Sequence, residues 1–210
     1  MKIGPKYKIA RRLGAGIFEK TQTQKFALRQ SQKGGKGKGG KGGKGGGRGG
    51  PKTDFGVQLL EKQKARYSYL LTEKQFSNYV KKALARKGAN KDLLFGLLEN
   101  RLDNVVLKAG FGTTRQGARQ IVSHGHLTVN GIRVNVPSYA VKVGDKIAIR
   151  EGSMKKGVFN GLDERLKTHK TPAWIKLDVD KKVIEVQGAP KLVQEELLFD
   201  IGQVLEFYSR

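Results

Sequence analysis

Apolar residues between positions 51 and 110 recur every three or four residues, a spacing typical of helices. One helix is expected to begin after Thr53 or Asp54. A second should begin after Thr72, where Gln75 completes a capping box, and should end at Gly88. The expected buried stripes are Phe76, Val80, Ala83 and Leu84 in that helix, and Leu94, Leu98, Leu102, Val105, Val106 and Ala109 before a stop at Gly110.

A helix followed by a hairpin is predicted for residues 113–134. Thr113 and Gln116 form another capping box, and Gly125 should stop the helix. Residues 127–134 then alternate around Asn130-Gly131, the strongest short hairpin signal, so that Val129 should pair with Ile132. Alternation places Leu127, Val129, Ile132 and Val134 on an apolar face, and His126, Thr128, Arg133 and Asn135 on a polar face.

The remaining pattern predicts more strands and helices, and hence an α+β fold. Val141, Val143, Ile147 and Ile149 should form a strand pair around Gly144-Asp145. A helix is expected at about residues 154–166, then two strands around a turn near Asp180-Lys181. Trp174 is interpreted as a packing residue, not as a platform for a stacked base. Apolar residues after Pro190 predict a carboxyl-terminal helix or pair of turns.

The charge of the chain narrows its choice of partners. There are 42 Lys and Arg against 18 Asp and Glu, which gives a net charge of +24 and a pI near 10.3. Such a charge requires an anionic partner, nucleic acid first and an anionic membrane surface second. No apolar run approaches the roughly 18–20 residues that span a bilayer, and no secretory signal follows Met1. Since Cys is absent, disulfides and Cys-ligated zinc are excluded.

Two basic segments open the chain. Residues 1–33 mix cations with turn-forming residues, and we expect an arm that its partner orders. Residues 34–50 contain only Gly, Lys and Arg, which predicts a flexible linker in the free protein. A nucleotide-binding loop is rejected, because the preceding strand and the Gly-Lys-Ser/Thr ending are both missing. Two roles for residues 34–50 therefore stay open: a cationic tether that binds the RNA backbone, or a solvated linker.

The three histidines do not indicate a metal site. His124 and His126 are near neighbours, but no third ligand has a suitable spacing. Contact with RNA, or a place on the polar face of the hairpin, is favoured. We expect neither a metal nor another cofactor.

Four strings in residues 101–145 resemble the S-four RNA-binding domain, namely RLDNVV, TTRQGARQIVSHGH, VNG and VNVPSYAVKVGD. More narrowly, they resemble the copy in bacterial-type small-subunit ribosomal protein S-four. Three further strings resemble the same family: IGPKYKIARRLG, FGVQLLEKQKARYSYLLTEKQFSNY and EFYSR. The resemblance leaves out the Gly-Lys tract and the stretch around residues 180–200. Family members often carry a cysteine zinc knuckle or a PGQHG-like stretch near that tract, and this chain has neither.

The resemblance implies a helical domain with an inserted S-four (alpha-L) RNA-binding domain of helices plus a small antiparallel sheet. The chain's end should return to pack on the first helical domain. The expected divisions are an extended basic amino-terminal arm at 1–33, a Gly/Lys tether at 34–51, a helical domain at 52–97 completed by 188–210, and the S-four domain with an additional helix and strands at 98–187.

The resemblance also implies a function for this chain. It implies a non-enzymatic, structural constituent of the small ribosomal subunit that binds 16S-type ribosomal RNA early, at a helical junction in the subunit body, and so nucleates assembly. It also implies a place near the channel through which messenger RNA enters the subunit, a contact with the neighbouring protein S-five, and a part in decoding accuracy. We expect a cytoplasmic ribosome and no membrane partner; an organellar ribosome stays open.

Arg115 and Arg119 are the leading candidates for RNA contact, because they lie four residues apart on the helix face opposite Ala118 and Ile121, and should be exposed. Such cations relieve the repulsion between phosphates that folded RNA brings together. The carboxylate of Asp103 is expected to orient a neighbouring Arg or to cap the backbone. The alternative is that Asp103 only makes the surface of its helix more soluble. The predicted RNA-binding residues are Arg101, Asp103, Thr114, Arg115, Arg119, His124, His126, Thr128, Asn130, Arg133, Tyr139, Lys142, Arg11, Arg12, Lys62, Lys64, Arg66, Lys74, Lys81 and Lys82.

Two other functions are weighed against this one. S-four modules also occur on pseudouridine synthases, whose catalytic Asp lies in an Arg-Leu-Asp motif followed by Thr and Gly. Here Asn104-Val105-Val106 follows Arg101-Leu102-Asp103, and no separate catalytic domain fits in the remaining length. The other alternative is a nonspecific nucleic-acid binder, which the Gly-Lys tract alone would suit. The patterned helices and hairpin favour a partner surface of defined shape.

Overall fold

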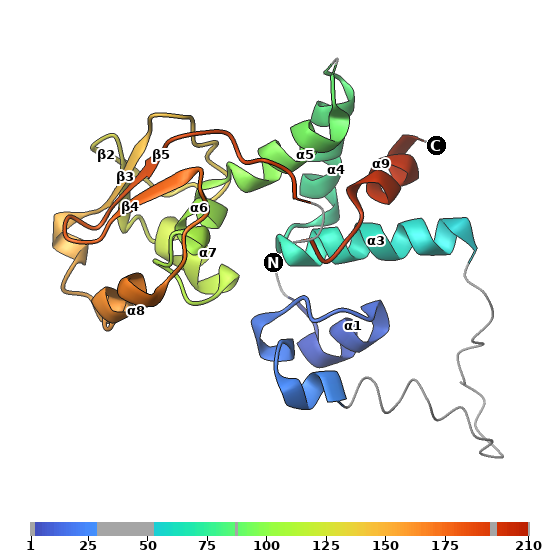
Figure 1. Ribbon diagram of the computed structural model, residues 1–210, viewed down its shortest axis with the longest axis horizontal. Coiled ribbons are helices and arrows are strands. Elements are labelled where there is room, and N and C mark those ends of the chain that lie inside the picture. The colour runs from blue at the N-terminus through green and yellow to red at the C-terminus, as the bar shows by residue number, and fades with distance from the viewer. Residues whose placement is uncertain (1–2, 29–52, 87, 194–196, 210) are drawn as a thin grey trace. The chain divides into compact units, whose positions relative to one another are not determined.

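A computed structural model describes residues 3–28, 53–86, 88–193 and 197–209 of the chain (Figure 1). They form two compact units, one of residues 1–77 and 193–210 and one of residues 78–192. The predicted Gly/Lys tether at 34–51 lies outside the described residues.

Helices build the first unit, and their starts follow the predicted capping signals. Helix α3 (Asp54–Ser68) begins where the Thr53 hydroxyl accepts a hydrogen bond from the backbone of Gly56, at 3.2 Å. At the start of α4 (Glu73–Leu84), Thr72 and Gln75 exchange two side-chain-to-backbone bonds of 3.3 Å. Both capping predictions are confirmed, because capping depends only on neighbouring residues.

The amino-terminal segment is folded, which corrects the expected extended arm. It contains α1 (Lys6–Leu13) and a short 3-10 turn, η1 (Glu19–Thr21). Six buried apolar residues form a core of their own: Ala10, Leu13, Ile17, Phe18, Phe26 and Leu70. Leu70 follows α3 in this same unit, so a residue far along the sequence completes the core.

The carboxyl-terminal helix α9 (Ile201–Ser209) packs on α3. The Phe55 and Phe207 rings lie 5.5 Å apart, and Gln58 donates a 3.0 Å hydrogen bond to Glu206. The expectation that the chain's end returns to the first helical domain is confirmed.

In the second unit, the helix expected up to Ala109 is two helices, α5 (Asn90–Glu99) and α6 (Leu102–Lys108). Arg101 between them is extended and forms an isolated β-bridge with Ala140. The backbone of Leu102 donates to the Tyr139 carbonyl at 2.9 Å, and that of Val141 to the Asn100 carbonyl at 2.8 Å. These bonds to a distant loop replace helical bonds, which is why the apolar spacing alone could not show the break.

Five antiparallel strands form the sheet of this unit, in the order β2-β1-β3-β5-β4. They are β1 (Leu127–Val129), β2 (Ile132–Val134), β3 (Lys146–Ile149), β4 (Ile175–Asp178) and β5 (Val183–Val186). The hairpin register is the predicted one, with Val129 opposite Ile132 and positive φ at Asn130 and Gly131. The strands around the Asp180-Lys181 turn are confirmed as well.

One strand prediction is wrong, and one residue of the predicted apolar face is uncovered. Residues 141–143 form no strand, and Val143 is 61% exposed, because β3 pairs instead with β1 and β5. Ile132, expected on the apolar face, is 71% exposed because β2 is the edge strand of the sheet.

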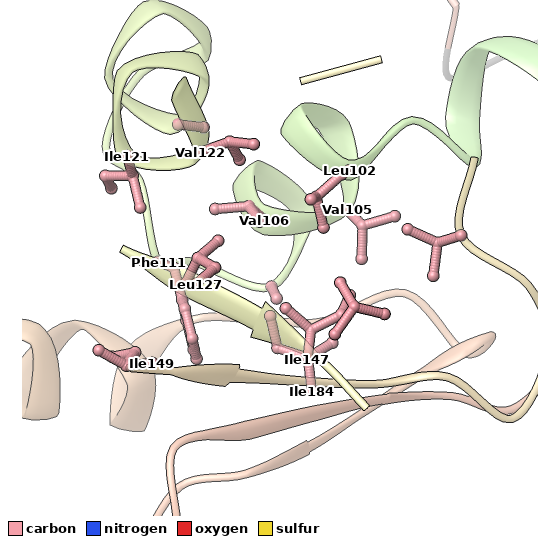
Figure 2. Close-up of a cluster of buried hydrophobic side chains, with 14 of the residues drawn as sticks. Leu102, Val105, Val106, Phe111, Ile121, Val122, Leu127, Ile147, Ile149 and Ile184 are labelled. Atoms are coloured by element: carbon pink, nitrogen blue, oxygen red, sulfur yellow. The ribbon is translucent and has the colours of Figure 1, made fainter. Parts of the chain in front are cut away.

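The core lies between the sheet and helices α6 and α7 (Arg115–Ser123), as Figure 2 shows. Leu102, Val105 and Val106 extend from α6 toward Leu127, Ile147 and Ile184 of the strands. Trp174 is partly buried against this core, as its interpretation as a packing residue requires. The core holds α6 and α7 in a fixed relation to the hairpin.

The helix expected over residues 154–166 is shorter. Two 3-10 turns, η2 (Glu151–Ser153) and η3 (Gly157–Phe159), precede α8 (Leu162–Thr168). Gly157 and Gly161 disfavour a continuous helix here.

Candidate nucleic-acid interface

A buried ion pair anchors the start of α6. The Arg101 Nε and Nη2 donate to the two carboxylate oxygens of Asp103 at 3.0 and 2.7 Å, and Nη1 donates to the Tyr79 hydroxyl at 2.7 Å. Burial by itself would lower the pKa of Arg101, but Asp103 and Tyr79 hold it above the ordinary value. The predicted role of Asp103 in orienting an Arg is confirmed. Arg101 itself is 2% exposed, so the prediction that it contacts RNA is corrected.

The two arginines of α7 are half-buried and tied to α6, and so are not freely exposed as predicted. Arg115 Nη1 donates to the Asn104 side chain at 2.6 Å, and Asn104 in turn donates to buried Glu99 at 2.8 Å. Arg119 Nη1 lies 3.8 Å from the Asp103 carboxylate. Since their orientation is fixed by acidic and amide groups beneath them, the two guanidinium groups lose little entropy on meeting an anion.

The cap of α7 is one residue later than predicted. The Thr114 hydroxyl, and not that of Thr113, accepts a 3.0 Å hydrogen bond from the backbone of Gly117. Thr114 therefore has a structural task that occupies its hydroxyl oxygen as an acceptor.

Two basic side chains, His124 and Arg133, lie where α7 ends and the hairpin begins. His124 is exposed at the carboxyl end of α7. Arg133 is exposed on β2, and its Nε donates a 3.3 Å hydrogen bond to the carbonyl of Gly125. Thr128, also on the predicted polar face, is half-buried and donates to Ala148 at 3.4 Å. The structure thus brings together His124 and Arg133, which the sequence pattern placed on separate elements.

His126 is buried beneath the segment that follows β3. Its Nδ1 lies 3.1 Å from the Ser153 hydroxyl, and its ring packs edge-on against Phe159. This burial corrects the prediction of a surface donor, because the alternation of a hairpin cannot show what later covers it. Burial lowers the pKa of His126, and four neighbouring basic groups lower it further: Lys156, His124, Arg150 and Arg133.

Arg150 and Lys156 were not among the predicted site residues. Both follow β3 in a basic stretch, which was the signal available in the sequence. Their proximity to the hairpin depends on the turns η2 and η3, which the sequence pattern did not predict.

Three further predicted residues lie near β3, Tyr139 and Lys142 in the loop before it and Asn130 in the hairpin turn. Tyr139 and Lys142 are exposed. Asn130 donates to Asp145 at 2.8 Å and accepts from the backbone of Lys146 at 2.9 Å, so its amide positions the hairpin turn. Its side chain is exposed, so the predicted RNA contact stays a prediction beside this structural role.

The cations of α3 are engaged within the protein. Lys62 is 7% exposed; its Nζ lies 2.8 Å from Glu73 and 4.4 Å from the centre of the Phe207 ring, so the predicted RNA contact is corrected. Lys64 pairs with Glu61 at 2.6 Å, and Arg66 bonds Gln63 at 2.7 Å. Five other predicted cations are exposed, namely Arg11, Arg12, Lys74, Lys81 and Lys82.

Neither a metal site nor a membrane span was found in the described part of the chain. Residues 3–28, 53–86, 88–193 and 197–209 contain no group of three His, Cys, Asp or Glu that could hold an ion. No helix among them is both long and apolar enough to cross a bilayer.

Comparison with known proteins gives matches along the whole chain. Residues 1–99 match the family described as ribosomal protein S4/S9 N-terminal domain, and residues 100–147 match the S4 domain. The small ribosomal subunit protein uS4 of Roseiflexus sp. (strain RS-1) is 44% identical over 209 residues, covering 99% of this chain and 98% of that protein. The protein of the same name from Chromobacterium violaceum is 43% identical over 211 residues, with the same coverage. That of Chloroflexus aurantiacus is 40% identical over 210 residues, again covering 99% and 98%.

Proposed function

This chain belongs to the ribosomal protein S4 family, and we propose that it binds small-subunit ribosomal RNA directly, at a helical junction in the body of the subunit. Its membership makes it a structural component of the small ribosomal subunit and not an enzyme.

The observation that carries the proposal is the concentration of positive charge around the hairpin. Lys156, His124, Arg150 and Arg133 all lie close enough to His126 to lower its pKa. A cluster of cations on a folded surface is self-repelling until an anion neutralises it. Phosphates of an RNA junction, brought close together by the RNA fold, are the matching partner.

Arg115 and Arg119 give this surface its geometry. Both project from α7 with part of the guanidinium held by α6, through Asn104 and Asp103. Arginine recognises phosphate through a planar fork of donors, and a fork held in place favours one arrangement of phosphates over others. Recognition would then depend on junction shape and 2′-hydroxyls more than on base sequence.

We extend the proposal to the finer roles that the family resemblance implies. The protein binds early and nucleates assembly, lies near the channel through which messenger RNA enters the subunit, and contributes to decoding accuracy through contact with protein S-five. Its bacterial relatives support a cytoplasmic ribosome as its location.

The pseudouridine synthase alternative has lost its support. Asp103 is buried in an ion pair with Arg101, where it cannot reach a nucleotide. The relatives that align with this chain over 98% of their own length are named as small-subunit ribosomal proteins.

Salt-dependent binding separates the proposal from nonspecific attraction. Binding to a junction fragment of small-subunit ribosomal RNA would be measured at several salt concentrations, with an unstructured RNA of equal length as competitor. Binding that survives the competitor supports recognition of shape. Equal affinity for the two RNAs with a steep salt slope would show that charge alone governs binding, and the proposal would fail.

A further inference from the structure

A small hollow lies in the second unit beside α7, with a volume of about 80 Å³. One wall is a stripe of that helix, formed by Gly117, Gln120, Ile121 and His124. Arg165 of α8, Val158 of η3 and His126 also line it. Three elements that are separate in the sequence therefore enclose one space.

The guanidinium of Arg165 is incompletely paired. Its Nε and Nη2 are buried, and neither has a hydrogen-bond partner among the residues that the structure describes. A buried donor without a partner costs free energy, more so when it is charged. Nε and Nη2 are also the edge through which arginine grips the two oxygens of a phosphate or carboxylate. Because Arg165 also lines the hollow, an anionic group that enters it would supply the missing partner once the side chain turns this edge toward it.

The surroundings favour an anion of small size. His124 lines the hollow. Together with Arg150, Lys156 and Arg133, it lowers the pKa of His126, which also lines the hollow. One water occupies about 30 Å³ of liquid. A space of about 80 Å³ therefore accepts two or three groups of that size, which suits the oxygens of a phosphate but not a whole base.

We propose that this hollow receives a backbone phosphate of the bound RNA, with Arg165 as its principal ligand and His124 at its side. The choice of RNA as the source of the phosphate rests on the function proposed above. The site adds a contact from α8, which lies outside the residues matched to the S4 domain, 100–147.

Two variants of the full-length protein test the site. Arg165→Met removes the buried guanidinium, and Lys167→Met removes an exposed cation two residues later on α8. Arg165→Met should weaken binding to the junction fragment roughly tenfold, because a charge-assisted bond to phosphate is lost. It should also reduce the slope of log affinity against log salt by about 0.7 to 0.9, the contribution of one phosphate. Its melting temperature should stay the same or rise, since an unpaired buried charge is removed.

The same variants define what would overturn the inference. If Arg165→Met binds like Lys167→Met, or loses melting temperature together with affinity, Arg165 has only a structural role. Inorganic phosphate gives a readout without RNA: it should raise the melting temperature of the wild type but not of Arg165→Met, at equal ionic strength. An equal rise in both proteins, or an equal effect of acetate on the wild type, would refute a phosphate site. If the wild type shows no preference for the junction fragment, the proposed function fails, and the phosphate titration still decides the site.

Discussion

Arg101 and Asp103 are two residues apart in the sequence and form a two-pronged ion pair in the interior, where their side chains are 2% and 4% exposed. The pair fixes the extended residue that separates α5 from α6. Asp103 also lies 3.8 Å from Arg119 of α7, so one carboxylate connects the interior to the proposed RNA surface.

Removal of one member of this pair should destabilise the protein strongly. Asp103→Ala leaves the Arg101 guanidinium buried without its main partner, at an expected cost of about 3–5 kcal/mol in the free energy of unfolding. Urea denaturation measures the change. Asp163→Ala is the matched control, because it breaks the more exposed pair with Lys182 and should cost about 1 kcal/mol or less. Similar losses in the two variants would contradict a structural role for the buried pair.

The arginines of α7 should affect binding and stability together. Replacing both Arg115 and Arg119 with Ala should weaken binding to junction RNA by several kcal/mol at most, since two oriented cations are lost. It should also lower the free energy of unfolding by about 1–2 kcal/mol, because the bond to Asn104 is broken. Gln116→Ala, a change of an exposed residue on the same helix, controls for altered helix propensity. Normal RNA binding by the double variant would show that α7 does not face the RNA.

His126 should make stability depend on pH. Its pKa in the folded protein lies below the ordinary 6.5 because of burial and nearby cations. Between the folded and the unfolded pKa of His126, the unfolded chain binds more protons, so the free energy of unfolding rises with pH. The contribution of His126 to stability is therefore lost as the pH falls from about 6.5 toward the folded pKa. Urea titrations at several pH values should show this loss in the wild type and in His124→Gln, which changes an exposed ring. In His126→Gln the loss should be smaller; an unchanged pH dependence would assign it to other groups.

Gly125 should be needed for the position of Arg133. Its φ is +65°, and an added Cβ would lie 2.5 Å from the Arg133 Nε. Gly131→Ala is the control, since its φ is +83° but nothing lies within 4 Å of its Cβ. Both substitutions should cost about 1 kcal/mol of backbone strain, whereas Gly125→Ala alone should displace Arg133 and weaken RNA binding. Equal RNA affinities for the two variants would show that the position of Arg133 is unimportant.

The parts of the fold that local chemistry determines could be predicted from the sequence. Thr53, Thr72 and the Asn130-Gly131 turn act on neighbours within a few residues, and the caps and hairpin register that they predict are present. The break at Arg101 could not be predicted, because it depends on bonds to the loop at Tyr139. The same holds for the amino-terminal core, which Leu70 completes from far along the chain.

The candidate site was predictable only as a set of elements. Residue type and spacing placed cations on α7 and the hairpin, and His124 and Arg133 are indeed exposed there. Burial depends on segments that follow later in the chain, so the alternation predicts a surface position for His126, which in fact lies beneath Ser153. Spacing on a helix likewise could not show that Lys62 is covered by Phe207.

Lys62 and Lys81 allow the structural cations to be separated from those available to RNA. Lys62 joins three elements of the first unit: it pairs with Glu73 at 2.8 Å, and its Nζ lies over the Phe207 ring of α9. Tyr208 donates a further 2.8 Å hydrogen bond to Glu73, so removal of Lys62 also weakens a shared network. Lys81 is exposed on α4.

Lys62→Met should therefore lower the free energy of unfolding by about 1–3 kcal/mol, the cost of leaving Glu73 with fewer partners. RNA affinity, measured where both proteins are folded, should be nearly unchanged. Lys81→Met should do the reverse, with stability within about 0.5 kcal/mol of the wild type and a shallower dependence of RNA binding on salt. A Lys62→Met variant that keeps its stability but loses RNA affinity would place the α3 cations on the RNA surface after all. The pairing of Lys62 with Glu73 would then be a contact that RNA displaces.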